Sequence, residues 1–359
     1  MTIDQKTIER LRRDPDVPDV DLSWLNPKDT PGIAVKAGKR GLTLDEINIG
    51  VYGEVPDLAQ HGTTRVRGST PRSGVVRTAY FVPEKSDIWA DNATLIYEEA
   101  VQRQWSSATD IPWETVQPLP DDVEEAICQI CTFLTEVEFI AGDAPGQWLK
   151  QISPDHYEVA LYLVTQVMDE ARHLDVFRKR ALVNGCGLLE AQGATRGLRN
   201  ILDAKDFTEM SALMHVLAEG FVQTMFRTGE FIAQNEAEKT IFRLCAQDES
   251  RHVGFGVMHL RYVLEHAPER REEIHHYLDR AEQLFGHPTD GGGTSALQEA
   301  LMITMGGGKK HIDKGAELAM ALTKKQANEY MHRLEVAGLG ERRYRMNPAF
   351  GLLLDPPKK

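Results

Sequence analysis

The sequence has few of the features that mark secreted, membrane or nucleic-acid-binding proteins. Only four cysteines occur in 359 residues, which is too few and too scattered for a disulfide scaffold. No stretch approaches the roughly 18 apolar residues of a membrane span, and the N-terminal residues lack the apolar core of a signal peptide. Acidic residues outnumber basic ones by 54 to 41, and the formal charge of −13 argues against nucleic acid or an anionic membrane as a partner. We therefore expect a reduced, cytoplasmic, soluble protein.

Nucleotide-binding patterns are also missing. The glycine clusters at 291–293 and 306–308 lack the preceding strand and the spacing of a phosphate-binding loop. No flavin or nicotinamide motif is visible, and strand signals are weak along the whole chain. We therefore expect the electrons for any redox chemistry to come from a separate reductase or ferredoxin.

The sequence does contain a series of helical patterns after an irregular start. Residues 1–86 are rich in Pro, Gly and other turn signals, with a short helix near 4–13, and we expect an irregular arm packed on the core. From residue 87 onward, apolar residues recur at helical spacing, as expected for amphipathic helices. The segments are 87–107, 121–142, 154–184, 195–203, 206–234, 236–266 and 269–285. The predicted fold is all-α, with a helical domain over 87–285 and a C-terminal helical extension and tail over 286–359.

One motif occurs twice in the helical region. Residues Asp169–His173 read DEARH, and residues Asp248–His252 read DESRH, each on a long predicted helix. A glutamate in an apolar stripe lies one helix earlier in each case, and these two residues are Glu138 and Glu219. The region is therefore interpreted as two copies of one helix pair.

The Glu and the His of each motif lie three residues apart, so they share one face of a helix. Apolar residues occupy the same face, which directs Glu170, His173, Glu249 and His252 into the interior. A buried carboxylate is costly unless it is paired or binds a metal. Four carboxylates and two imidazoles in one interior form the ligand set of a di-iron or di-manganese site in a helical bundle. Mixed oxygen and nitrogen ligands with exchangeable positions suit Fe(II) better than a closed zinc site.

The phase of the apolar stripes selects the remaining two glutamates. Glu138 lies in the stripe of the 121–142 segment and Glu136 lies off it, so we favour Glu138 over Glu136 as the first ligand. Glu219 is the only acidic residue in its stripe. The predicted metal ligands, which are also the predicted catalytic residues, are Glu138, Glu170, His173, Glu219, Glu249 and His252.

The residues beside the ligands repeat as well. A metal-bound histidine usually donates its other N–H to a carboxylate or carbonyl. We assign Asp169 and Asp248 to this role, each serving the His of the opposite copy, with Arg172 and Arg251 compensating their charge. The competing interpretation is a charged helix face, which a single Glu-x-x-His would favour. Two copies on apolar faces, each with a partner Glu, favour the metal site.

At these residues the sequence resembles the ferritin-like di-iron carboxylate superfamily. The closest resemblance is to the catalytic subunits of bacterial multicomponent monooxygenases and related ferritin-like non-haem di-iron oxygenases. Residues 104–113 are also similar to the Trp-rich lead-in before the first ligand helix, and the likeness covers about residues 90–266. The resemblance implies a ferritin-like four-helix bundle core with accessory helices, the six residues above as iron ligands, and reductive O2 activation.

Three positions depart from members of this superfamily. The monooxygenase subunits carry a Thr four residues after the third Glu, where this chain has Gln223, so their proton-delivery arrangement does not carry over. Ribonucleotide reductase small subunits carry a radical Tyr where this chain has Phe177, which excludes a tyrosyl radical there. Arylamine N-oxygenases carry a third His where this chain has Cys245. The chain is also shorter than a multicomponent hydroxylase subunit, which favours a stand-alone or ferredoxin-fed enzyme.

The predicted function is a non-haem di-iron oxygenase or oxidase that activates O2 to hydroxylate or otherwise oxidise a small organic substrate. Its cofactor would be two Fe ions, with a Mn/Fe pair as the alternative, and O2 would be the co-substrate. One competing function is a ferritin- or rubrerythrin-like iron-binding or peroxide-scavenging protein. Another is an oxidase similar to the ribonucleotide reductase small subunit but without the radical Tyr. A homodimer is compatible with the sequence.

Three weaker signals have alternative interpretations. Cys128 and Cys131 lie within one predicted helix, and core cysteines are favoured over a redox pair or a second metal site. His215 precedes Glu219 by one helical turn, and a core histidine is favoured over a group that serves the site. Trp105 is expected to be a packing residue rather than an electron conduit.

Overall fold

The structure is a computed structural model that describes seven stretches of the chain. They are 4–11, 34–59, 64–69, 84–184, 186–190, 195–286 and 295–357. Within these stretches the chain is helical, and β-structure is limited to two isolated bridges. The predicted all-α fold is therefore confirmed. No helix in the described stretches combines the length and the apolar character needed to cross a bilayer.

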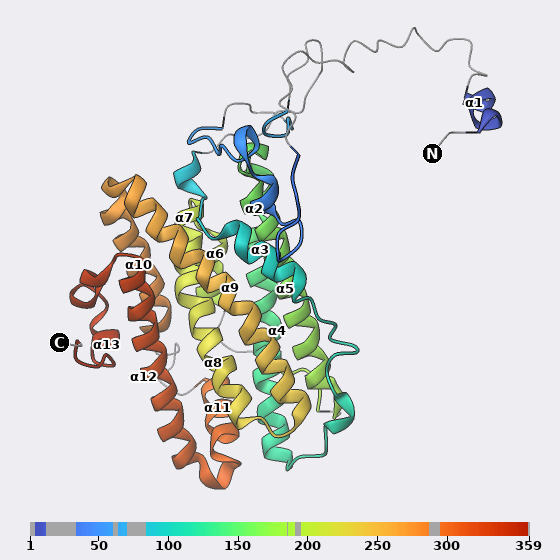
Figure 1. Cartoon of the computed structure of the whole chain (residues 1–359). Coiled ribbons are helices and arrows are strands. Elements are labelled where there is room, and N and C mark those ends of the chain that lie inside the picture. Colours follow the sequence, from blue (N-terminus) through green and yellow to red (C-terminus); the bar gives the residue numbers. More distant parts are fainter. Residues whose placement is uncertain are drawn as a thin grey trace.

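The described helices form a central bundle and a set of accessory helices around it (Figure 1). The main bundle helices are α4 (Asp121–Gly146), α5 (Tyr157–Val183), α8 (Glu219–Ile232) and α9 (Glu236–His266). The accessory helices are α1 (Gln5–Leu11), α2 (Leu44–Ile47), α3 (Ala93–Gln102), α6 (Thr195–Leu202), α7 (Phe207–Ser211), α10 (Arg271–Gly286), α11 (Ala296–Gly306), α12 (Ile312–Val336) and α13 (Pro348–Gly351). The glycine cluster at 291–293 lies outside the described residues.

Two antiparallel helix pairs form the core. Helix α4 packs along α5, and α8 packs along α9, as the extensive contacts between the members of each pair show. Helix α5 also contacts α9, which joins the two pairs into a four-helix bundle. Helix α3 covers α5, α11 lies against α4, and α12 lies against α8 (Figure 1). This arrangement places the two copies of the repeated motif, on α5 and α9, in facing helices.

Polar side chains just before several helices determine where these helices begin. Asp206 accepts a hydrogen bond from the Glu209 N–H before α7, and Asn235 accepts one from the Glu238 N–H before α9. Ser153 does the same in the short turn that leads into α5. Such caps satisfy N–H groups that have no partner within the helix. They explain why the predicted starts near 154, 206 and 236 agree with the structure.

Two predicted helices have different bounds in the structure. The segment 87–107 is helical only over Ala93–Gln102, and α4 continues past the predicted end at 142 to Gly146, through Pro145. A proline removes one hydrogen bond and usually ends a helix. Here only one residue of α4 follows Pro145, so little helix is left to disrupt.

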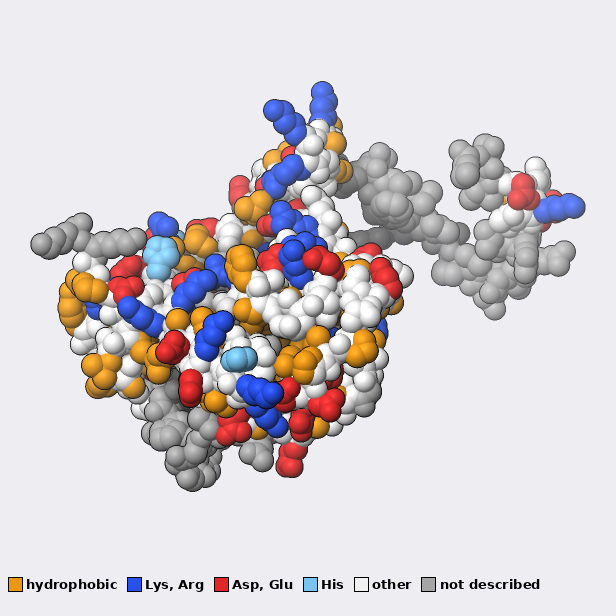
Figure 2. Space-filling view, turned by 90° about the horizontal axis from the view of Figure 1, so that it is seen from below, with side chains coloured by type: hydrophobic (Ala, Val, Ile, Leu, Met, Phe, Trp, Pro, Cys, Tyr) orange, Lys and Arg blue, Asp and Glu red, His pale blue; other side chains and the backbone are white. Residues whose placement is uncertain are grey.

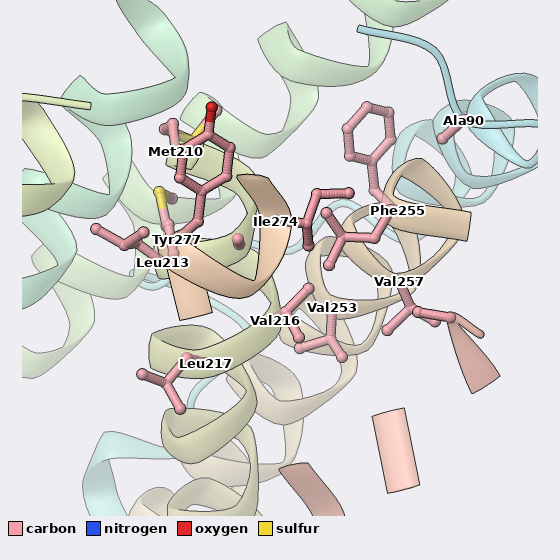
Figure 3. Packing of buried hydrophobic residues seen from close by; sticks show 14 of the residues in the cluster. Ala90, Met210, Leu213, Val216, Leu217, Val253, Phe255, Val257, Ile274 and Tyr277 are labelled. Carbon is pink, nitrogen blue, oxygen red and sulfur yellow. The ribbon is translucent and has the colours of Figure 1, made fainter. Parts of the chain in front are cut away.

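The predicted helix 206–234 is interrupted by a π-helical segment, η7 (Ala212–Ala218), between α7 and α8. Its apolar side chains, among them Leu213 and Val216, belong to a buried cluster with residues of α9 and α10 such as Val253 and Tyr277 (Figure 3). A second buried cluster lies around Phe177 and the start of α4. The polar centre described below lies between these two apolar clusters.

Asn48 and Arg67 of the N-terminal arm contact the start of α5. The guanidinium of Arg67 forms a buried ion pair with Glu158 and also donates to the Asp155 carbonyl at 2.6 Å. Asn48 donates to Glu158 at 2.9 Å. These contacts attach the parts of the arm around Asn48 and Arg67 to the bundle through polar groups. On the described part of the face seen in Figure 2, acidic and basic side chains are interspersed with hydrophobic ones.

Candidate metal centre

The structure brings all six predicted ligands together inside the bundle. They come from four helices, with Glu138 on α4, two residues on α5, Glu219 at the start of α8, and two on α9. None of the six is more than 4% exposed. Glu136, the alternative to Glu138, is exposed. The apolar phase of α4 therefore selected the glutamate that points inward.

The six residues divide into two groups that share two carboxylates. One group is Glu138, Glu170, His173 and Glu249, and the other is Glu170, Glu219, Glu249 and His252. In each group the candidate ligand atoms lie within 4.8 Å of one another. Each group offers three carboxylates and one imidazole. Two cations held this way would share Glu170 and Glu249, and each would have its own outer glutamate.

The imidazole orientations agree with this division. Nδ1 of His173 lies 3.1 Å from Glu170 Oε2 and 3.5 Å from Glu249 Oε1. Nδ1 of His252 lies 3.0 Å from Glu170 Oε1 and 3.3 Å from Glu249 Oε2. The two oxygens of each shared glutamate therefore face different histidines. This is the placement that bridging carboxylates require between two metals.

The repeated aspartates contact the histidines crosswise. Nε2 of His173 lies 3.3 Å from Asp248 Oδ2, and Nε2 of His252 lies 3.2 Å from Asp169 Oδ2. Arg172 and Arg251 each form ion pairs with both aspartates. With the aspartates accepting the Nε2 protons, Nδ1 of each imidazole would be the atom available to a metal ion. The contacts are those expected from the repeat.

Several buried atoms of the centre lack a protein partner. They include one oxygen of each outer glutamate, Glu138 Oε1 and Glu219 Oε2. Burial raises the pKa of Glu138 and of Glu219 well above the ordinary carboxyl value. Burial opposes the charge of Glu170 too, but the neighbouring His252 imidazole holds the pKa of that carboxyl below its usual range. Unpartnered carboxylate oxygens in a dry interior are tolerated when cations coordinate them, so the donor set fits a pair of metal ions.

A hydrogen-bonded chain supports one of the outer glutamates. Nε2 of Gln166 donates to Glu219 Oε1 at 3.0 Å, Gln166 Oε1 lies 3.2 Å from His215 Nε2, and His215 Nδ1 lies 2.9 Å from Ser211 Oγ. A carboxylate can only accept hydrogen bonds, so the Gln166 amide N–H is the donor to Glu219. The Gln166 oxygen then accepts from the His215 Nε2–H, and His215 Nδ1 accepts from the Ser211 hydroxyl. Burial lowers the pKa of His215 to about 3, which keeps the imidazole neutral.

The sequence only partly indicated this series of hydrogen bonds. His215 is a buried core histidine, as we favoured, but its hydrogen bonds connect it to Glu219. Gln166 was missed, although its position four residues before Glu170 places it on the same face of α5. Trp105 is buried, and its indole N–H donates to Asp248 Oδ2 at 2.7 Å. Trp105 therefore packs against the centre, as expected, and also forms a hydrogen bond with it.

Two cavities reach the centre. A solvent-open groove of about 690 Å³ between α4, α5 and α6 is lined by Glu138 and Glu170 and by side chains such as Phe139, Val167 and Leu202. A second cavity of about 20 Å³ adjoins Glu138, Glu219 and Glu249 and is otherwise apolar. The groove can admit an organic molecule to one face of the centre. The small cavity has room for one molecule of the size of water.

No protein-family model matches the chain, and no curated protein is similar to it. Solved structures do match. One variant of an R2-like ligand-binding oxidase with an aerobically reconstituted Fe/Fe cofactor has a TM-score of 0.52 and 17% identity, over 69% of this chain and 94% of that chain. A variant with a Mn/Fe cofactor has a TM-score of 0.50 and 15% identity over the same shares. These similarities show the fold, so the ferritin-like bundle expected from the resemblance is confirmed.

Proposed function

We propose that this protein is a dimetal oxidase that uses O2 to oxidise a small organic substrate. Six buried ligands from four helices, arranged as two groups that share Glu170 and Glu249, carry the proposal. The R2-like ligand-binding oxidases of the same fold contain Fe/Fe or Mn/Fe cofactors, which supports a pair of these metals here. Two Fe ions are the first choice and Mn/Fe is the alternative. A bound metal pair of this kind supplies the reductive activation of O2.

The protein's own residues perform the remaining tasks. Glu170 and Glu249 hold the two metal positions together, and the outer glutamates bind one position each. Asp169 and Asp248 accept the Nε2 protons of the histidines and so keep Nδ1 free to bind metal. The two apolar clusters shield the centre from water on the sides away from the groove. Limiting water at the site reduces the side reactions of activated oxygen with solvent.

The groove beside Glu138 supports an organic substrate. Its wall combines an exposed aromatic ring, Phe139, with the aliphatic side chains of Val167, Leu174 and Leu202, and its rim carries Arg199 and other charged groups. Such a lining suits a mainly apolar molecule with a polar end. Hydroxylation or another oxidation of this substrate is part of the proposal, as is a cytoplasmic location. Electrons would come from a separate reductase or ferredoxin, and a homodimer stays a prediction.

The main alternative is an iron-storage or peroxide-scavenging protein, and metal analysis separates it from an oxidase. The purified holoprotein should contain two metal ions per chain, whereas storage gives many. After anaerobic reduction, exposure to O2 should change the optical spectrum. Oxygen consumption should increase when a suitable organic compound is added, because an oxidase of this kind couples O2 to that compound. A chain without bound metal, or with many irons per chain, would contradict the proposal.

A further inference from the structure

A pair of cysteines lies far from the metal centre, near the start of α4. Cys128 precedes Glu138 by ten residues, which corresponds to about 15 Å along the helix axis. Cys186 follows the end of α5. Because α4 and α5 run antiparallel, the start of one helix meets the end of the other. This end of the helix pair takes no part in the proposed reaction.

Three hydrogen bonds join the start of α4, the end of α5 and the segment that follows Cys186. The Cys128 thiol donates to the Ala181 carbonyl at 3.4 Å, and the Gly187 N–H donates to the same carbonyl at 2.9 Å. The Leu189 N–H donates to Thr132 Oγ1, one turn further along α4, at 3.0 Å. The chain that follows Cys186 is therefore held close to Cys128.

The two thiols differ in environment. Cys128 is fully buried, whereas Cys186 is exposed. Burial raises the pKa of the Cys128 thiol, and the adjacent Cys186 thiol raises it further. Burial also raises the pKa of Cys131 and of Cys245 to about 12. Thiolate character and exposure govern oxidation of cysteine, so Cys186 is the thiol that a dissolved oxidant reaches first.

We propose that Cys186 and Cys128 form an oxidative modification site, a reversible disulfide produced by hydrogen peroxide. In the first step the Cys186 sulfur takes one oxygen from H2O2, giving a sulfenic acid and one water. In the second step the Cys128 sulfur attacks the Cys186 sulfur, the S–O bond breaks, and the Cys128 proton leaves with the hydroxide as a second water. Two thiols are oxidised and one peroxide is reduced, and a dithiol reductant reverses the change.

The disulfide would connect α4 to the segment that follows α5. These two helices supply Glu138, Glu170 and His173 and form the groove at the other end of the pair. A cross-link between residues 58 positions apart removes freedom mainly from the unfolded chain. The oxidised protein should therefore unfold at a temperature a few degrees higher than the reduced protein.

The test uses the full-length holoprotein treated with a small excess of H2O2. Free thiols are then blocked with an alkylating reagent, and the protein is digested without reduction. We expect two of the four thiols to become unavailable and the peptides containing Cys128 and Cys186 to be linked. The Cys186→Ser variant should lose this link, and the Cys131→Ser variant, one helical turn away from Cys128, should keep it.

Three outcomes would overturn the proposal. They are a disulfide between Cys186 residues of two molecules, over-oxidation of Cys186 without a cross-link, and a link between Cys128 and Cys131. Because Cys186 is exposed, its replacement by Ser does not disturb the core, so loss of the link in this variant reports on chemistry rather than on misfolding. The result does not depend on whether the metal centre is an oxidase.

Discussion

His173 takes its carboxylate partner from the other copy of the repeated motif: its Nε2 lies 3.3 Å from Oδ2 of Asp248, which belongs to α9. The reciprocal contact joins His252 to Asp169 at 3.2 Å. Each histidine is thus oriented by the helix that carries the other one. Arg172 and Arg251 lie between the two aspartates and balance their charge. Neither half of the centre is positioned independently of the other.

Removal of a shared carboxylate should empty both metal positions. We expect Glu170→Ala to lose nearly all bound metal, because Glu170 belongs to both ligand groups. Metal content of the purified variant, determined by elemental analysis, measures this. Glu136→Ala, in the exposed residue two positions before Glu138, is the matched control and should keep two metals per chain. Full occupancy in Glu170→Ala would refute the ligand assignment.

Loss of the Gln166 amide should weaken metal binding without emptying the site. Gln166→Leu removes the donor to Glu219 and leaves that carboxylate free to change its position. Replacement of a residue that orients a ligand typically costs about 10- to 100-fold in metal affinity. Titration of the metal-free protein with Fe(II) under anaerobic conditions measures the change. Gln223→Leu, whose amide donates to Ser250 instead, should bind Fe(II) as the wild type does.

Access through the groove should depend on the absence of a side chain at Gly142. A Cβ atom there would lie 3.6 Å from the Cβ of Glu170, which is ordinary contact, so Gly142→Ala should be tolerated. The longer side chain of Gly142→Leu should narrow the groove beside Glu170. Binding of azide to the oxidised metal centre, followed optically, should slow by an order of magnitude or more in the Leu variant alone. Equal rates in both variants would show that small ligands enter elsewhere.

The buried Arg180 should be essential for stability. Its guanidinium pairs with Glu124 and Glu238 and is 1% exposed. Removing one member of a buried ionic cluster leaves uncompensated charge and costs about 3–5 kcal/mol. We expect Arg180→Met to lower the free energy of unfolding by about that amount in a denaturant titration. Arg178→Met, in an exposed arginine on the same helix, should change it by no more than about 0.5 kcal/mol.

Acid should destabilise the protein in part through His259. Burial lowers the pKa of this histidine to about 4, whereas the unfolded chain binds a proton near 6.5. Stability is therefore fully present above pH 6.5 and is lost as the pH falls towards 4, by up to about 3 kcal/mol. His259→Asn should show a shallower loss of stability over this range. His276→Asn, in an exposed histidine, should follow the wild type.

The sequence predicted the helices and the six inward-facing residues because both depend on periodicity. The apolar phase that separated Glu138 from Glu136 is local information, and so is the spacing of Glu170 and His173. The resemblance to the ferritin-like superfamily added the bundle into which these residues fold. These parts of the structure follow from patterns within single helices.

Other features depend on contacts that no single helix encodes. The π-helical segment η7 before Glu219 packs against α9 and α10, which lie further along the chain. Gly256 illustrates this, because a Cβ there would collide with His215 Cβ at 2.3 Å. The partnership of Cys128 with Cys186, rather than with the nearby Cys131, likewise requires α4 and α5 to be antiparallel. Such relationships appear only when the helices are placed together.

The crosswise contacts between histidines and aspartates make the two helix pairs depend on each other. One helix pair carries an outer glutamate, a Glu-x-x-His and an aspartate, but its histidine is served by the aspartate of the other pair. Neither pair alone therefore contains a complete half of the centre, and both pairs must dock before either histidine is oriented. The π-helical segment η7 precedes Glu219 in one pair only, so the two pairs differ in backbone as well as in sequence.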